Sequence, residues 1–180
     1  QLTHFEDPTS RLQALDVGPS RAYFLVLSAT AGQELWSTDG TPANTHAATS
    51  FGYHEPFGYD ANLLARHAFL AVAGSRAYFI ASDGIHNPQL WRTGGDAASA
   101  TVVAEICTEL ECGGSWVEAV GDRALFSAAS DLGVEPMITD GSGEAARVVL
   151  DICPGSCSSR PQGQKVLNSG RVIFSTYPDP

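Results

Sequence analysis

Lysine is almost missing from this 180-residue chain: Lys165 is the only one, beside nine arginines. Ten basic residues face twenty acidic ones, so the net charge is −10. Such an acidic chain excludes a general affinity for nucleic acid, whose phosphates need a basic footprint, and for anionic membrane surfaces. Cations and neutral partners such as carbohydrate stay open.

Long apolar runs are also lacking. None approaches the roughly 18 residues of a membrane-spanning helix, so we predict no membrane insertion. No signal peptide is present, and the sequence begins with Gln1 rather than Met. We interpret this start as a processed N-terminus, after signal removal, or as a fragment of a longer chain.

Catalytic signatures are missing as well. The sequence contains no HExxH or HxH pair, no GxSxG nucleophile elbow, no P-loop and no GxGxxG after a strand. Carboxylates are numerous, but the sequence alone pairs none of them in space. We therefore predict a non-enzymatic protein, and we keep an extracellular glycoside hydrolase as a weaker alternative because fold does not decide function.

Sustained helical periodicity is absent too. Residues 60–74 come closest, and we expect at most one helical turn in their first half and a strand in the second. Elsewhere short apolar and β-branched runs are bounded by turn signals, as in "WVEAVGDRALFSAAS" over 116–130, where "GD" splits two strands. The sequence predicts an all-β chain.

What the sequence does have is an internal repeat. An "R-A-x-F" landmark begins at Arg21, Arg76 and Arg123, and "RVIF" begins at Arg171. A second landmark follows twelve or thirteen residues later as "ELWSTDG", "QLWRTGG" and "EPMITDG". A third, "TVVAEIC" over 101–107, matches "RVVLDIC" over 147–153. We leave open whether the recurring arginines pair with the Glu or Asp of the second landmark.

About four short strands per unit and a period of 46 to 55 residues are typical of β-propeller blades. We predict a single repeat domain over 1–180: a propeller-like array of about four four-stranded blades. The alternatives are an open β-repeat fragment and a β-sandwich. The units span approximately 10–64, 65–114, 115–159 and a partial 160–180, with residues 1–9 completing the last blade.

The four cysteines form two local pairs, "CTELEC" and "CPGSC". Neither spacing is the CxxC of zinc ribbons, and no histidine lies near them, so we predict disulfides Cys107–Cys112 and Cys153–Cys157 over a zinc site or free thiols. Cys107 and Cys153 occupy equivalent repeat positions, which supports a structural role. Disulfides indicate an oxidising compartment.

The second landmark carries a recognisable signature. "ELWSTDGTPANT", "QLWRTGGDAASATVVAEIC" and "EPMITDGSGEAARVVLDICPGSCSSRP" resemble the ELWxxDGT repeat, which occurs in tandem in secreted and surface proteins of myxobacteria and other bacteria. The resemblance covers almost the whole chain. It implies export and an all-β, propeller-like array, and it implies no particular biochemical activity.

The chain departs from this motif at several positions. Gly94 replaces the motif Asp that Asp39 and Asp140 keep, while Pro136 and Met137 replace Leu and Trp. A calcium ion bound by that Asp in every blade would therefore fail in the second. We expect the two aspartates to cap the turn that follows, with a calcium ligand as the alternative. The equivalent residues Trp36 and Trp91 are expected to pack between blades.

The first repeat contains an insertion at 49–62, and insertions in repeat proteins form loops that carry function. Its candidate carbohydrate-binding residues are aromatic or polar: Phe51, Tyr53, His54, Phe57, Tyr59 and Asp60. The alternative is a structural plug or a subunit contact. Three histidines surround the insertion, but we predict no metal site there and no cofactor.

These observations predict a secreted, extracellular or cell-surface protein that acts as a structural, adhesive or self-assembling module. Its partner would be another copy, reached through edge strands, or a cell-surface glycan. The alternative function is a carbohydrate-binding propeller that uses the 49–62 insertion.

Overall fold

The structure is a computed structural model that describes residues 2–51, 70–81, 88–106 and 116–177. Antiparallel strands dominate these ranges, and the helical pieces described within them are two single 3-10 turns, η1 (Pro42–Asn44) and η2 (Ala97–Ser99). No helix in the described part of the chain is long and apolar enough to cross a membrane.

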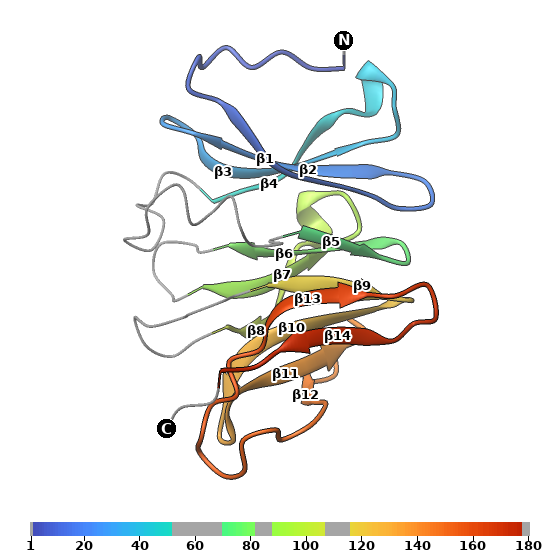
Figure 1. Cartoon of the computed structure of the whole chain (residues 1–180). Coiled ribbons are helices and arrows are strands. Elements are labelled where there is room, and N and C mark those ends of the chain that lie inside the picture. The colour runs from blue at the N-terminus through green and yellow to red at the C-terminus, as the bar shows by residue number, and fades with distance from the viewer. Residues whose placement is uncertain (1, 52–69, 82–87, 107–115, 178–180) are drawn as a thin grey trace.

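Three sheets have four strands each, and in each sheet every strand pairs with the next along the chain (Figure 1). The first sheet contains β1 (Arg11–Val17), β2 (Ala22–Ser28), β3 (Gly32–Thr38) and β4 (His46–Ser50). The second contains β5 (Leu70–Ala73), β6 (Arg76–Ala81), β7 (Gln89–Thr93) and β8 (Thr101–Glu105). The third contains β9 (Val117–Val120), β10 (Arg123–Ser130), β11 (Gly133–Thr139) and β12 (Arg147–Val148).

The fourth sheet has two strands, β13 (Gln162–Val166) and β14 (Val172–Ser175). The first strands of successive sheets contact one another, β1 with β5, β5 with β9 and β9 with β13. This arrangement puts one inner strand per sheet along a common line, as the blades of a propeller do. It confirms the predicted all-β, propeller-like array, with three four-stranded sheets and one of two strands.

The sequence repeat is matched by the strand pairing: the second and third strands of each four-stranded sheet pair in the same register. Phe24 pairs with Trp36 in the first sheet, Phe79 with Trp91 in the second, and Phe126 with Met137 in the third. Aromatic and β-branched residues suit these pleated surfaces, and tight turns join their strands. Gly121, for example, has φ +62° in the turn between β9 and β10, a conformation that glycine adopts at no steric cost.

The core consists of two layers, each lying between neighbouring sheets. One layer joins the first two sheets and the other joins the second and third, as the members of each cluster show. Strand β6 contributes to both layers: Phe79 lies in the first cluster, and Tyr78 and Ile80 in the second. A single sheet cannot bury both faces, so each depends on its neighbours.

The N-terminal segment differs from the prediction. Residues 1–9 were expected to complete the last blade, but the described residues 2–9 lie against the first sheet. The Asp7 carboxylate accepts hydrogen bonds from the Thr30 hydroxyl at 2.6 Å and from Thr9, beside the turn between β2 and β3. The Phe5 ring meets Trp36 edge-on, with centroids 5.1 Å apart. Local polar and aromatic contacts therefore hold this segment on the blade that follows it.

Candidate functional site

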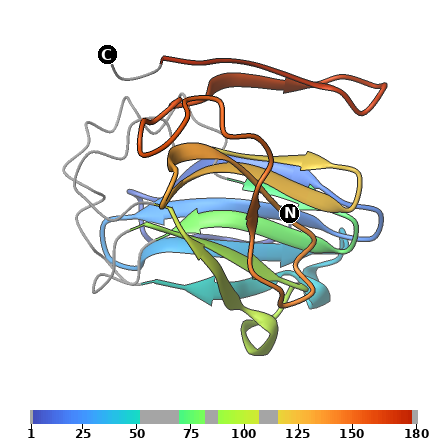
Figure 2. The same ribbon diagram turned by 90° about the horizontal axis from the view of Figure 1, so that it is seen from below.

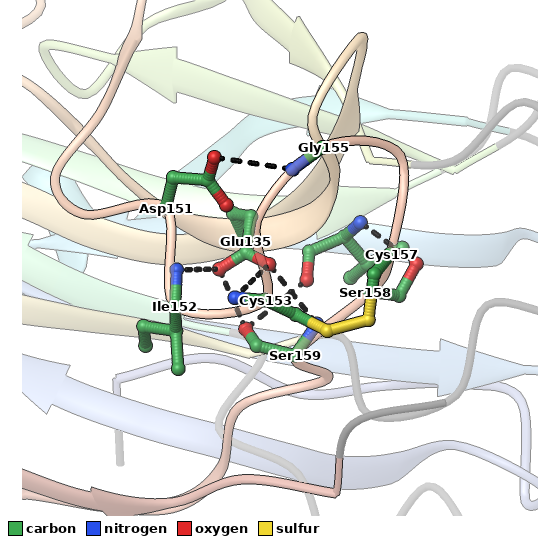
Figure 3. Close-up of a disulfide and its surroundings, with 9 residues drawn as sticks. Glu135, Asp151, Ile152, Cys153, Gly155, Cys157, Ser158 and Ser159 are labelled. Carbon is green, nitrogen blue, oxygen red and sulfur yellow. Dashed lines mark hydrogen bonds between the residues drawn. A yellow bond between two sulfur atoms is a disulfide. The ribbon is translucent and has the colours of Figure 1, made fainter. Parts of the chain in front are cut away.

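The disulfide Cys153–Cys157 is present, as predicted, with its Cα atoms 5.2 Å apart (Figure 3). It closes a short loop after β12, and this short spacing is within the usual range for a disulfide. The predicted partner pair, Cys107 and Cys112, lies outside the described residues. The confirmed bridge supports an oxidising compartment.

A buried carboxylate holds this loop in place. The Glu135 side chain, with 0% of its surface exposed, accepts hydrogen bonds from the backbone N–H groups of Ile152 and Ser159 at 3.2 and 3.0 Å. It also accepts one from the Ser159 hydroxyl at 2.7 Å and one from the Cys153 N–H at 3.4 Å (Figure 3). The glutamate of the second landmark thus anchors the loop that carries the disulfide.

The two motif aspartates cap turns. Asp39 accepts hydrogen bonds from the Thr41 N–H and hydroxyl and from Asn44, at 2.7 to 2.9 Å. Asp140 accepts one from the Ser142 N–H at 2.8 Å. These bonds, led by the Thr41 hydroxyl and by the Ser142 N–H, lower the pKa of the two carboxyls below its usual value. Both carboxylates therefore act as turn acceptors.

The second sheet shows how the motif tolerates Gly94. There the cap moves two residues on: the Asp96 carboxylate accepts a hydrogen bond from the Ser99 N–H at 2.9 Å. The Ser99 hydroxyl in turn accepts one from the Gly94 N–H. Within the described residues, no group of three or more His, Cys, Asp and Glu side chains could hold a metal ion.

A threonine–x–glycine turn follows the third strand of each complete sheet. In all three, the threonine hydroxyl accepts a hydrogen bond at 3.0 Å from the glycine N–H two residues later. The pairs are Thr38 with Gly40, Thr93 with Gly95, and Thr139 with Gly141. Each glycine has a positive φ, between +66° and +116°. We call this element the TxG turn.

The TxG turn of the second sheet docks on the first sheet. The imidazole Nε2 of His46 lies 3.0 Å from the Gly95 carbonyl oxygen. A β-carbon at Gly95 would lie 3.1 to 3.3 Å from side-chain atoms of Ser37, Arg21 and Tyr23. A β-carbon would press on these side chains, and Gly95 has φ +116°, a conformation that favours glycine. The turn therefore fits closely on this surface, which we call its seat.

The third sheet repeats this contact on the second. Arg92 donates a hydrogen bond to the Gly141 carbonyl oxygen, and Arg76 donates one to the Asp140 carbonyl oxygen at 3.3 Å. A β-carbon at Gly141 would collide with the hydroxyl of Tyr78, which is fully buried. Burial also raises the pKa of that hydroxyl. Tyr23 and Tyr78 are equivalent residues of the repeat, so in both seats a tyrosine hydroxyl lies against the glycine of the docked turn.

The corresponding seat on the third sheet is an open hollow of about 90 Å³, lined by Arg123, Ile138, Thr139, Asp140, Glu144, Ala145 and Arg147. Arg123 is equivalent to Arg21 and Arg76 by the repeat. Arg147 pairs with Ile138 as His46 pairs with Ser37 in the first sheet. Arg123 and Arg147 are exposed, whereas Arg21 and Arg76 are half-buried. The hollow therefore has the donors of a turn seat and no described turn on it.

No protein-family model and no curated protein matches this chain in sequence. Solved structures match it in shape. TolB from Acinetobacter baumannii superposes with a TM-score of 0.54 over 92% of this chain at 10% identity. Puromycin hydrolase gives 0.55 over 94% at 16% identity, and the acylaminoacyl peptidase of Pyrococcus horikoshii gives 0.51 over 95% at 8%.

The shared fold is a β-propeller-like array. This chain spans 37% of the TolB chain and 25% of each of the other two. At such low identity the likeness shows the fold alone, and it establishes no catalysis in this chain. From here the four sheets are called the first to fourth blades.

The blades use the predicted aromatic residues in two ways. The Trp91 ring meets Phe51 of the first blade at 4.9 Å between centroids, so it packs between blades. The equivalent Trp36 stacks on Phe24 of its own blade and meets Phe5 of the N-terminal segment. Phe5 therefore takes the place on Trp36 that Phe51 takes on Trp91.

The structure corrects the ligand-binding prediction for Phe51. Its backbone N–H donates to the Gln33 carbonyl oxygen, which continues the pairing of β4 and turns the ring into the core. The ring is 9% exposed and contacts Phe79 and Trp91, so no sugar can stack on it. The other five candidates, Tyr53, His54, Phe57, Tyr59 and Asp60, lie outside the described residues.

The turn seats are not predicted by any pattern in the sequence analysis above. The available signal was the tyrosine shared by "RAYF" at 21–24 and 76–79, together with the final glycine of "TDG" and "TGG". Each residue is ordinary by itself. Only the three-dimensional offset of one blade shows that the tyrosine of one repeat belongs with the glycine of the next.

Proposed function

We propose that this chain is a secreted, non-enzymatic structural module that works by assembling with other repeat chains. The observation that carries the proposal is the hollow on the third blade, where Arg123 and Arg147 stand exposed. The position of Arg147 binds a turn in the first blade, through His46, and that of Arg123 binds one in the second, through Arg76. On the first and second blades, the equivalent surface is covered by the TxG turn of the next blade. The chemistry of the hollow therefore suits a protein partner.

Exposed strand surface among the described residues supports the same proposal. The fourth blade has two strands, so β14 is an edge strand in the described structure. Edge strands with unpaired backbone groups are templates for pairing with another chain. On the first blade, Leu12, Leu15 and Val17 of β1 are exposed. The described strands therefore offer backbone edge and apolar side chains that a protein partner would bury.

Several features favour a non-enzymatic role. The hollow is lined by arginines, carboxylates and apolar carbons, and its lining contains no serine, cysteine or histidine. The hydroxyl of Thr139 is engaged with the Gly141 N–H. The likeness to hydrolases covers a quarter of those chains and supports a shared scaffold only. Secretion is supported by the disulfide Cys153–Cys157.

The proposal is tested by the molecular mass of the native chain, measured by light scattering over a wide concentration range. We expect the mass to rise with concentration, because a head-to-tail contact between unlike surfaces does not limit itself to two copies. A parallel series in high salt should show weaker association, since arginines take part in it. A strict monomer at every concentration would refute self-assembly.

A further inference from the structure

The disulfide loop after β12 has two legs, and both are hydrogen-bonded to one carboxylate. The first leg reaches Glu135 through the backbone N–H groups of Ile152 and Cys153, at 3.2 and 3.4 Å. The second leg reaches it through the N–H and the hydroxyl of Ser159, at 3.0 and 2.7 Å. The bridge Cys153–Cys157 joins the two legs beside that carboxylate (Figure 3). The disulfide therefore keeps together the donors that satisfy a fully buried carboxylate.

The second leg continues into the connection between the third and fourth blades. Figure 2 shows the fourth blade as a separate layer beside the third, with this connection leading into it. The Ser159 carbonyl oxygen accepts a hydrogen bond at 2.9 Å from the N–H of Tyr177, which follows β14. The Pro161 carbonyl oxygen, just before β13, accepts one at 2.7 Å from the indole N–H of Trp116, which is buried in the third blade. Residues 152–161, which we call the latch, therefore contact both blades.

The second leg of the latch contains a strained residue. Arg160 has φ +44°, and in the described part of the chain it is the one residue other than glycine with a positive φ. This conformation is costly for a residue with a side chain, and a residue before proline is restricted further. The leg also packs tightly on the turn between β10 and β11, where a β-carbon at Gly133 would collide with the Cys157 carbonyl. Such a backbone persists only where its surroundings impose it.

We propose that the latch is controlled by oxidation: the bridge between Cys153 and Cys157 fastens the fourth blade to the third, and its reduction releases that contact. With the bridge broken, the loop gains conformational freedom, so the legs separate and water replaces their hydrogen bonds to Glu135. The strained second leg then relaxes, and its hydrogen bonds to Trp116 and to the fourth blade are lost. Because the bridge joins residues only four positions apart, it constrains little of the unfolded chain, and its effect is local.

Closing the latch is a thiol–disulfide exchange. The two cysteine thiols form one S–S bond and give up two protons and two electrons, which pass to a low-molecular-weight disulfide such as oxidised glutathione and convert it into two thiols. Reduction by a dithiol reverses the exchange. The latch therefore stays open in a reducing compartment and closes when the chain reaches an oxidising one. This inference goes beyond the proposed function, because it needs no second copy of the chain.

The test is hydrogen exchange in the full chain, followed by NMR with and without dithiothreitol. We expect reduction to speed exchange at the Tyr177 N–H and at the Trp116 indole N–H by at least about tenfold, because local opening exposes both groups to water. The indole N–H of Trp36, which donates to Glu34 in the first blade at 3.2 Å, is the internal control. Its exchange should not change.

Two double variants separate this bridge from the other cysteine pair, since dithiothreitol acts on every disulfide. Cys153→Ser with Cys157→Ser should speed exchange at the Trp116 indole without any reductant. The matched control, Cys107→Ser with Cys112→Ser, should exchange there as the parent does. Circular dichroism checks that both variants keep their fold.

Two outcomes would overturn the inference. Unchanged exchange at Tyr177 and Trp116 after reduction would show that Glu135 holds the legs without the bridge. Equal acceleration in β2 and β3 of the first blade would show a general loss of stability in place of a local latch, and a cysteine variant that fails to fold would count the same way. Neither outcome bears on assembly, so a strict monomer leaves the latch standing and an unresponsive latch leaves assembly standing.

Discussion

Glu135 shows what a single residue does in this fold. It is a fully buried carboxylate, and it offsets that burial with hydrogen bonds from the loop over 152–159. A buried carboxylate costs much free energy unless its oxygens are satisfied. The equivalent Glu34 of the first blade is half-buried and accepts from the indole N–H of Trp36. The glutamate at this position of the repeat is therefore half-buried in the first blade and fully buried in the third.

We expect Glu135→Ala to destabilise the chain by about 3 kcal/mol or more, because it leaves buried N–H groups without an acceptor. Glu34→Ala is the matched control, and its cost should stay near 1 kcal/mol or below, as for a partly exposed hydrogen bond. Urea denaturation of the two variants and the parent measures both values. Equal costs would mean that Glu135 does not anchor the loop.

The TxG turn is the element that joins one blade to the next. Gly141 has φ +66° and would place a β-carbon against the Tyr78 hydroxyl, whereas Gly40 has φ +93° and open space around it. Alanine in either position carries a backbone cost of about 1 kcal/mol for the left-handed conformation. Only Gly141→Ala adds a clash with a buried side chain.

Gly141→Ala should therefore cost about 1–3 kcal/mol more than Gly40→Ala, the usual range for overpacking. Thermal and urea unfolding of the two variants test this difference. Removing the obstacle with Tyr78→Phe should recover part of the loss in Gly141→Ala, since the colliding atom is the hydroxyl. A similar cost for both glycine variants would show that the turn does not dock.

The positions of the secondary-structure elements could largely be predicted from the sequence. The repeat of "R-A-x-F" and the second landmark located the second and third strands, and their residues pair in the same register in three blades. The misplacement of Phe51 has a simple cause. The apparent insertion began at residue 49, but β4 continues to Ser50 and its pairing extends to Phe51. A strand end cannot be located from composition when the residues that follow it in the sequence are also aromatic.

The seats between blades stayed hidden for a different reason. Tyr78 and Gly141 lie 63 positions apart, and no spacing within one repeat links them. The contact depends on how far one blade is rotated from the next, which side-chain packing decides and sequence period does not. The N-terminal segment is a similar case. Asp7 and Phe5 bind the first blade through contacts with Thr30 and Trp36, and the sequence alone does not predict these partners.

Taken together, the described blades form an acidic, disulfide-bearing array in which neighbouring blades pack on one another. Its stability should follow the number of blade interfaces more than the total length, as in other repeat proteins. The confirmed bridge lies in the third blade, and the predicted one at the equivalent place in the second. Both would clip loops and neither spans two blades.

Intact mass spectrometry counts the disulfides of the chain and so tests whether it folds in an oxidising compartment. Full reduction of the native chain should raise its mass by about 4 Da, about 2 Da for each of two bridges. A rise of about 2 Da would contradict the pairing of Cys107 with Cys112 and leave Cys153–Cys157 in place. No change in mass would refute the oxidised state and remove the main support for secretion.

The seats also give the array a direction. In the two occupied seats a blade receives the turn of the blade after it, so these two interfaces run the same way. A gene that duplicates one repeat in frame inserts a unit whose two faces already fit both neighbours. An array of this kind can lengthen by recombination without inventing a new contact, and selection is then free to alter the loops at its rim.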